Sequence, residues 1–446
     1  MTVRFRHVWA TLRASYWFVP SVMTITAGVL AVVTITLDRA IEKEAAQEIP
    51  WVFSGGPEGA RAVLEVIAGS VMTTAGIVFS VTIAALSLAA SQLGPRLLQN
   101  FMRDTGNQVV LGTFIGTFLF CLLVLRTIRG EDAGDFSPPI SVTAGVVLAL
   151  ASLGVLIYFI HHVSISIQAP HVVAEVGGEL GRLVDRAFEA GDRPEPTAAP
   201  RPLPEGFEAR AAPVASRTTG YVQALDEAGL VELASEGDLL IVIERRPGHF
   251  AGSGAILAYV WPPEAVDERT EKRIRNCFVV GPKRTSEQDV EFAAEQLVEV
   301  AVRALSPSLN DPFTAMACLD WLGAGLCRAA RGRPPGPERT DAEGHARLVY
   351  RSPITFAGLV DRSFDQIRQY GGGTAAVAIR MLETLEEVIR CTGGRRDDVL
   401  VLVEHAEKLH RAAVAGIRDP RDLHDLEARY HRVTAAAGGM EPAPTG

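Results

Sequence analysis

The residues whose types and spacing could carry a function lie in the second of four long apolar segments, at residues 62–93. If the segment is a helix and Glu65 is placed at zero, a step of about 100° per residue puts small and polar residues within an arc of about 80°. Ile83 is the one bulky apolar residue on that arc. This polar stripe consists of Glu65, Gly69, Thr73, Gly76, Ser80, Ile83, Ser87 and Ser91. In a lipid-embedded helix such a face must meet protein or water.

Two interpretations of the polar stripe are open. Small residues let helices approach closely and hydroxyl groups can bond across helices, so the stripe could be a packing surface. Alternatively it lines a water-filled path, in which the Glu65 carboxylate at the outer mouth favours cations and Ile83 forms an apolar constriction. Glu65 also has a simpler explanation, because Arg61 lies one helical turn earlier and could pair with it.

Two further motifs lie in the third and fourth apolar segments. Gly112 and Gly116 form a G-x-x-x-G pattern, which is typical of a helix contact within one chain or between chains. His161 and His162 stand at the end of the fourth segment. They fit interfacial anchors, with a pH-sensing role as the alternative.

In the soluble part, the sequence ALSPSLNDPFTA at residues 304–315 predicts a corner between two helices. A proline ends the first helix, an aspartate is the predicted N-cap of the second, and a proline occupies its first position. A subunit contact or ligand loop is the alternative. The residues of this corner or interface are Ser306, Pro307, Asn310, Asp311 and Pro312. Just before it, Thr285 and Gln288 predict a capping box that opens a helix.

Signatures of catalysis are missing from the sequence, which contains no phosphate-binding P-loop, no H-E-x-x-H and no G-x-S-x-G motif. His405 and His410 are spaced so that they would lie about 140° apart on a helix, which favours a solvated face over a metal site. The absence of lysine at residues 216–263 removes an attachment point for lipoate or biotin. We therefore expect no enzyme, no metal and no cofactor.

Composition limits the class of protein. The 446 residues include 43 basic and 52 acidic ones, a net charge of −9, which argues against a nucleic-acid partner. The mean hydropathy of +0.18 indicates apolar spans. Five scattered cysteines without a C-x-x-C motif indicate neither a zinc knuckle nor a disulfide framework.

The four apolar segments predict a transmembrane domain at residues 1–168, with helices at about 16–37, 62–93, 109–125 and 140–163. A span of about 20 residues crosses the ~30 Å hydrocarbon core of a bilayer. Arg4, Arg6 and Arg13 precede the first helix without any acidic residue. Although Lys/Arg counts in the loops nearly tie, these arginines favour cytoplasmic N- and C-termini in a multi-pass protein of the inner cell membrane.

The remaining chain predicts a cytoplasmic α+β region. An exit helix and Pro/Ala linker at residues 169–213 are followed by a small β-module at 214–282, where the periodicity alternates. A helical cytoplasmic domain follows at 283–436, with a loop at 331–340, and a disordered tail at 437–446. The predicted fold class is a mostly α multi-pass membrane protein with four transmembrane helices.

Four sequence segments resemble a bacterial family described as a predicted membrane protein, domain of unknown function 2254. One departure is Thr219 before Gly220-Tyr221, where the family pattern more usually has serine. The resemblance covers most of residues 10–430, implies a membrane-protein class and implies no activity. The segments are Ser80–Phe101, Arg217–Asp226, Arg284–Asp289 and Ala304–Ala315.

From the residues, the leading hypothesis is a homo-oligomeric membrane pore or transport protein with a preference for cations and a cytoplasmic regulatory domain. Four helices leave little room for water inside one subunit, so a path would lie where subunits meet. The alternative is a membrane-anchored sensor or scaffold whose cytoplasmic half binds a partner. Both hypotheses imply the lipid bilayer as a partner, and an unidentified cytoplasmic ligand or protein.

Overall fold

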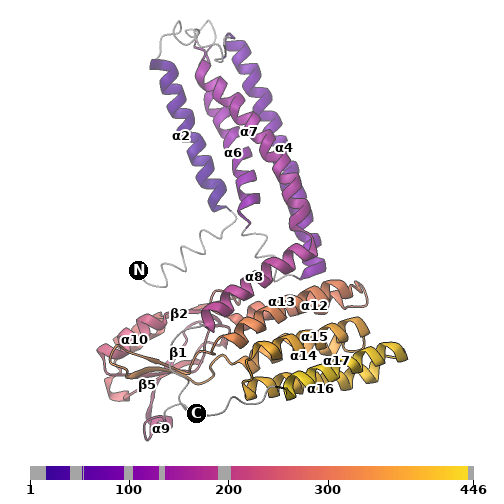
Figure 1. Cartoon of the computed structure of the whole chain (residues 1–446). Helices are drawn as coiled ribbons and strands as arrows, with labels where there is room; N and C mark the ends of the chain where they lie inside the picture. The colour runs from indigo at the N-terminus through magenta and orange to yellow at the C-terminus, as the bar shows by residue number, and fades with distance from the viewer. Residues whose placement is uncertain are drawn as a thin grey trace. The chain divides into compact units, whose positions relative to one another are not determined.

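Four long apolar helices make up the N-terminal part of this computed structural model, which describes residues 17–40, 53, 55–94, 104–129, 136–188 and 202–439. Each is long and apolar enough to cross a membrane (Figure 1). The shortest, with 21 residues, spans ~32 Å at ~1.5 Å per residue, close to the thickness of the hydrocarbon core. The helices are α2 (Phe18–Ala40), α4 (Pro57–Leu93), α6 (Thr105–Leu125) and α7 (Pro139–Ser166).

The predicted membrane segments and these helices differ only at their ends, with α4 beginning at Pro57 instead of near residue 62. The chain divides into two compact units, one up to His171 and one from Val172 onward. Arg4, Arg6 and Arg13, on which the predicted orientation depends, lie outside the described residues. The cytoplasmic position of both termini therefore stays a prediction.

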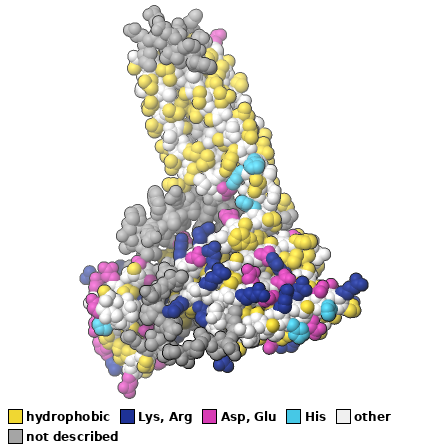
Figure 2. All heavy atoms as spheres, in the orientation of Figure 1, with side chains coloured by type: hydrophobic (Ala, Val, Ile, Leu, Met, Phe, Trp, Pro, Cys, Tyr) yellow, Lys and Arg dark blue, Asp and Glu magenta, His cyan; other side chains and the backbone are white. Residues whose placement is uncertain are grey.

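Within the membrane unit, α6 is the central helix. In its most apolar window 56% of the residues are buried, against 17–22% in the other three helices. The outer surface of the bundle is covered by hydrophobic side chains (Figure 2), including Ile25, Val66, Leu150 and Ile157, all more than half exposed. A surface of this kind fits contact with lipid tails, because exposing so many apolar side chains to water would be unfavourable.

Polar contacts inside the membrane unit fix how the helices pack. The Asp38 carboxylate at the end of α2 accepts hydrogen bonds from the backbone N–H groups of Ile140 and Ser141 at 2.8 and 2.9 Å, and from the Ser141 hydroxyl at 2.6 Å. It thereby caps the first turn of α7, whose N–H groups have no partner within the helix. Deeper in the bundle, the hydroxyl groups of Thr117 and Ser152 lie 3.2 Å apart.

The C-terminal unit combines two sheets with layers of helices (Figure 1). One sheet has five strands in the order β1-β5-β3-β8-β7, and the other has three in the order β4-β2-β6. The strands are β1 (Ala212–Ala215), β2 (Gly220–Leu225), β3 (Leu240–Ile243), β4 (Phe250–Ala251), β5 (Ile256–Trp261), β6 (Phe278–Gly281), β7 (Glu338–Thr340) and β8 (Ala346–Tyr350). A shared apolar core that includes Leu230, Ile241 and Leu257 holds the two sheets together.

Helices make up the rest of this unit; two short ones pack against the strands, and the later ones pack mainly against one another. In chain order they are α8 (Ala169–Ala187), α9 (Phe207–Arg210), α10 (Glu227–Glu236), α11 (Glu268–Asn276), α12 (Val290–Ala304), α13 (Pro312–Arg331), α14 (Phe356–Gly371), α15 (Ala375–Cys391), α16 (Arg396–Gly416) and α17 (Pro420–Gly438). Charged side chains are dense on the visible surface of this unit and sparse on that of the membrane helices (Figure 2). This contrast fits an aqueous environment for the C-terminal unit.

The structure differs from the predicted boundary between a β-module at 214–282 and a helical domain at 283–436. β7 and β8 come after α12 and α13, yet β8 pairs in parallel with β3 in the five-stranded sheet. The predicted module also contains α10 and α11. The two predicted domains therefore share one sheet. Most of the Pro/Ala linker, at 189–201, and the tail from residue 440 lie outside the described residues.

Candidate functional site

All eight residues of the polar stripe lie on the exposed face of α4. The opposite face packs into the bundle through small and apolar residues. A methyl group added at Gly69 or Gly76 would meet nothing within 4 Å. The stripe therefore does not pack against the other helices of the same chain among the described residues, and the packing interpretation survives only for contacts between chains. The buried face consists of Ala60, Leu64, Ala68, Val71, Ala75 and Val78.

Hydroxyl groups on the stripe are bonded to their own helix. Thr73 donates to the Gly69 carbonyl at 2.8 Å, and Ser80 donates to the Gly76 carbonyl at 2.9 Å. Ser91 donates to Leu88 in the same way. These local bonds satisfy the hydroxyl donors, so the expectation that each hydroxyl needs protein or water as a partner is wrong for them. The Glu65 carboxylate has no comparable bond to its own helix and still requires such a partner.

That carboxylate belongs to Glu65, two turns into α4. The explanation that Arg61 neutralises it is not supported, because no ion pair joins the two among the described residues, where both side chains are exposed. An exposed carboxylate on a helix that otherwise suits lipid must reach water or a partner copy. Of the residues on the stripe, Glu65 would therefore be the least favourable in contact with lipid alone.

The glycine pair on α6 packs against α2 within the chain. A β-carbon at Gly112 would lie 2.6 Å from the Met23 Sδ atom and 3.1 Å from the Pro20 Cα atom, and one at Gly116 would lie 3.3 Å from the Ala27 Cβ atom. Of the two predicted roles, the structure shows the contact within one chain. The pair therefore gives no support to an oligomer.

Gly112→Val should lower the thermal stability of the full-length protein in mild detergent, because its side chain would overlap α2. Overpacking of this kind costs roughly 1–3 kcal/mol. The matched control is Gly154→Val on α7, where an added carbon would meet nothing within 4 Å. Equal unfolding temperatures for the two variants would contradict the close contact between α6 and α2.

His162 forms a polar cluster at the end of α7. Its Nε2 atom lies 2.5 Å from Oδ2 of Asp104, and the Tyr158 ring stacks on the imidazole with centroids 5.2 Å apart. Asp104 is also the N-cap of α6, accepting from the Gly106 N–H at 2.8 Å. His162 therefore links α7 to the start of α6, a tertiary role that neither a lipid-facing anchor nor a pH sensor requires.

The ALSPSLNDPFTA segment forms the corner between α12 and α13. Asp311 is the N-cap of α13 and Pro312 its first residue, as the sequence predicts. The Asp311 carboxylate accepts from the backbone N–H of Thr314 at 3.1 Å and from its hydroxyl at 2.5 Å. Asn310 adopts a positive φ of 46° to complete the turn. On the outer side, 78% of Phe313 is exposed, so the alternative of a contact with another molecule stays open.

The segment Arg284–Asp289 joins three parts of the C-terminal unit. The Gln288 side chain exchanges two hydrogen bonds with the Leu225 backbone of β2, at 2.8 and 3.2 Å, and the Ser286 hydroxyl bonds to Glu179 of α8. The N-cap of α12 is Asp289, which accepts from Phe292 N–H at 3.0 Å. The predicted capping box at Thr285 and Gln288 is therefore wrong, because these side chains bond to β2 instead.

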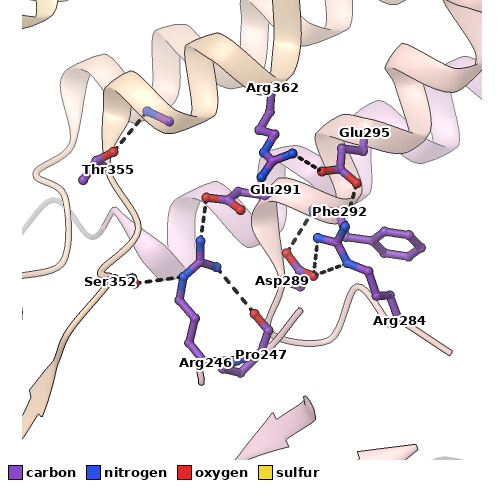
Figure 3. Close-up of polar contacts among 11 residues, drawn as sticks. Arg246, Pro247, Arg284, Asp289, Glu291, Phe292, Glu295, Ser352, Thr355 and Arg362 are labelled. Carbon is purple, nitrogen blue, oxygen red and sulfur yellow. Dashed lines mark hydrogen bonds and ion pairs between the residues drawn. The ribbon is translucent and has the colours of Figure 1, made fainter. Parts of the chain in front are cut away.

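At the start of α12 lies a network of ion pairs (Figure 3). Arg284 donates to Oδ2 of Asp289 from two nitrogens, at 3.0 and 2.7 Å, and to Glu295 at 2.7 Å. Asp289 is fully buried, and burial raises the pKa of its carboxyl group although the Arg284 charge opposes the shift. Burial alone would lower the pKa of Arg284, but the carboxylates of Asp289 and Glu295 raise it overall. Arg284 therefore keeps its charge and compensates a costly buried carboxylate.

A pocket of about 260 Å³ lies beside this network, within the C-terminal unit. Three arginines from separate elements line it, namely Arg186 of α8, Arg246 after β3 and Arg339 of β7. The buried ring of Tyr350 and the apolar side chain of Leu183 form part of its wall. The mixture of apolar wall and a few charged groups is typical of a site for a small ligand.

Two of the three arginines are already paired. Arg246 binds Glu291 at 2.7 Å, and Arg339 binds Glu227 at 2.7 Å. Arg186 has no ion-pair partner among the described residues and is exposed. A ligand with a negatively charged group would therefore find its free cation at Arg186, with the other two guanidinium groups nearby. This pocket could not be predicted from the sequence, because its residues are dispersed from α8 to the segment before α14.

His405 is buried, whereas the sequence predicts that it lies on a solvated face of its helix, α16. Only 1% of the residue is exposed, and its Nε2 atom lies 2.8 Å from Oδ1 of Asp361 on α14. The predicted solvated face is therefore wrong for His405, because α14 packs over this side of α16 and supplies the partner, which the periodicity of α16 alone does not show. No group of three or more potential metal ligands occurs in the part of the chain that the structure describes.

These features define a multi-pass membrane protein with a C-terminal α+β unit. The chain belongs to the family described as predicted membrane protein, domain of unknown function 2254, whose model matches residues 13–387. It is 31% identical over 446 residues to an uncharacterized protein of Mycobacterium tuberculosis (strain H37Rv), covering 97% of this chain and 83% of that protein. An uncharacterized protein of Mycobacterium bovis shows the same identity and coverage. No solved structure matches the chain.

Proposed function

We propose that this protein is a homo-oligomeric membrane pore or transport protein that prefers cations and carries a regulatory C-terminal unit. The observation that supports it best is that every residue of the polar stripe lies on the exposed face of α4. In an oligomer these faces would meet around a path, and the stripe would then line water. Catalysis is no part of this proposal.

The interior of a single bundle does not offer such a path, because side chains fill it. Leu64, Phe114 and Phe120 are at most 2% exposed, and they belong to two apolar clusters that link the described helices. A packed interior leaves no room for water molecules in a row. The proposed path therefore lies between subunits.

The shape of the exposed α4 face supports this position. Bulky side chains flank the stripe, since Val66 is 68%, Ile77 60% and Phe79 42% exposed. Apart from Ile83, the residues between them are glycines, small hydroxyl residues and Glu65, so the face is less bulky along the stripe than beside it. Facing stripes from neighbouring copies would enclose a path lined by small residues and hydroxyl groups, which suits a hydrated cation.

Glu65→Gln should weaken the preference for cations, because it removes the negative charge at the proposed mouth while keeping the size of the side chain. Reversal potentials measured across bilayers that contain the pure protein in a salt gradient would report the change. Glu65→Asp keeps the charge and should keep the selectivity. An unchanged reversal potential in Glu65→Gln would show that Glu65 does not lie at the mouth of the path.

We also propose the inner cell membrane as the location, with both termini in the cytoplasm. Four membrane helices put the two ends of the chain on one side, and the arginines before α2 favour the cytoplasmic side. The regulatory ligand would bind in the pocket lined by Arg186. Because α8 follows the last membrane helix directly in the chain, a ligand there would contact the segment nearest to the membrane unit in sequence.

A membrane-anchored sensor or scaffold is the second candidate, and the same pocket favours it. In that case the helices only anchor the chain, and ligand binding at Arg186 changes what the C-terminal unit binds. Ion flux through liposomes containing the pure full-length protein separates the two candidates. An intact oligomer that conducts nothing at several pH values and voltages would favour the sensor or scaffold.

A further inference from the structure

Two cysteine thiols meet between the last turns of α13 and α15. The Sγ atoms of Cys327 and Cys391 lie 2.6 Å apart although the residues are 64 positions apart in the chain, and both cysteines are free. A disulfide bond has an S–S distance of ~2.05 Å, so the two sulfur atoms need approach by only ~0.5 Å to form one.

Other contacts hold the two helices in this register. Asp320 of α13 binds Arg380 of α15 at 2.6 Å, and a β-carbon at Gly323 would lie 2.5 Å from the Thr384 side chain. Beyond the cysteines, Arg395 donates to the Gly332 carbonyl at 2.7 Å. Because contacts on both sides fix the helices, the thiols stay together without a covalent bond.

We propose that Cys327 and Cys391 form a redox-active dithiol, which a peroxide oxidises reversibly to a disulfide. Disulfides in a reducing compartment are mostly transient and redox-sensing, which is the setting expected for this unit. The inference does not depend on the proposed transport function.

The two thiols are not equivalent. Cys327 is buried, and burial raises the pKa of its thiol, with the neighbouring Cys391 and Glu387 acting in the same direction. Cys391 is half-buried, so a small oxidant can reach it. An Arg331 nitrogen lies 3.6 Å from the Cys391 sulfur and would stabilise negative charge there during attack. Cys391 is therefore the attacking thiol and Cys327 the resolving one.

The chemistry with hydrogen peroxide balances in two steps. The deprotonated Cys391 sulfur attacks one peroxide oxygen, an S–O bond forms, the O–O bond breaks, and the leaving hydroxide takes up the thiol proton as water. The Cys327 sulfur then attacks the Cys391 sulfenic acid, the S–S bond forms, and hydroxide leaves with the Cys327 proton as a second water. Two thiols thus lose two electrons to one peroxide, and a dithiol reductant reverses the reaction.

The bond would join the ends of two helices in the layer that contacts α8. On α13, the residue directly after Cys327 is Arg328, which binds Asp185 of α8 at 2.6 Å. A cross-link here would restrict the movement of α13 relative to α15 and would raise the unfolding temperature of the C-terminal unit.

The test uses full-length protein in mild detergent, first reduced with dithiothreitol and then treated with hydrogen peroxide. Peptide mapping by mass spectrometry should show nearly all Cys327 and Cys391 in one linked peptide, which dithiothreitol separates again. Cys327→Ser should leave Cys391 as a sulfenic acid that dimedone captures, and Cys391→Ser should leave Cys327 unreacted. Cys277→Ser is the control and should change nothing, because Cys277 has no thiol partner among the described residues.

Three results would overturn the proposal. In the first, peroxide leaves both thiols free or converts Cys391 to the sulfinic acid without any linked peptide. In the second, the purified protein already contains the bond and dithiothreitol does not reduce it, which would make it a structural disulfide. In the third, the linked peptide joins different chains. Each outcome is readable even if a variant folds poorly, because the wild-type protein alone reports it.

Discussion

Ile83→Ser should raise ion flux through the reconstituted protein by roughly tenfold, the factor that about 1.4 kcal/mol produces. Ile83 is 48% exposed and is the one bulky apolar side chain on the polar stripe. In a narrow path such a side chain repels water and creates a dry barrier to ions. A serine would wet the constriction and lower the barrier, so conductance should increase without a change in the number of channels.

Val81→Ser provides the matched control for this experiment. Val81 lies on the same helix and is 43% exposed, but its direction is about 80° beyond the edge of the stripe at ~100° per residue. It should therefore leave flux unchanged. Equal increases in flux in both variants would mean that any polar substitution on α4 disturbs the membrane. No increase in flux in Ile83→Ser would show that Ile83 does not form the constriction.

Arg284→Met should destabilise the C-terminal unit by about 3 kcal/mol, the lower end of the cost of leaving a buried charge unpaired. Asp289 is 0% exposed and takes two hydrogen bonds from Arg284. Burial raises the pKa of the Asp289 carboxyl group, and Arg284 opposes that shift. Without Arg284, the buried carboxylate loses the charge that stabilises it. Urea unfolding of the full-length protein in mild detergent, followed by hydrogen exchange at the start of α12, would measure the loss.

Arg328→Met is the control for the buried pair. The Arg328–Asp185 pair leaves 53% and 55% of the two side chains exposed, and pairs exposed to this extent contribute about 0–1 kcal/mol. If Arg284→Met shifts the urea midpoint no more than Arg328→Met does, the network at the start of α12 does not hold this part of the fold.

The membrane helices could be predicted from the sequence because their signal is local. An uninterrupted apolar run of about 20 residues has few alternatives in a folded protein. The same holds for the corner at Asp311, where the N-cap side chain bonds to an N–H group three residues ahead. Both features depend on neighbours in the chain, which the sequence displays directly.

Contacts between distant segments could not be predicted in this way. β8 is a five-residue strand, too short for a clear period, and its parallel partner β3 precedes it by about a hundred residues. Asp38 caps a helix that begins at Pro139, and the partner of Cys391 lies on another helix. Nothing local marks these residues, because each acts only on a side chain or backbone group that the fold brings to it.

On the polar stripe, periodicity shows which residues share a face of α4 but not which groups need a partner. The hydroxyl groups of Thr73 and Ser80 bond to carbonyls of their own helix. A hydroxyl in a helix always has that local option, so its presence alone does not require a partner. Glu65 has no such option, so its carboxylate still requires water or a partner chain.

Whether this protein is a pore between subunits is decided by cation flux through liposomes that contain the pure full-length protein. The oligomeric state is determined by native mass spectrometry on the same preparation. We expect a stable homo-oligomer and a cation flux that exceeds that of protein-free liposomes and rises with the amount of protein. A monomer in every lipid and detergent tried, or an intact oligomer without flux at several pH values and voltages, would contradict the proposed pore.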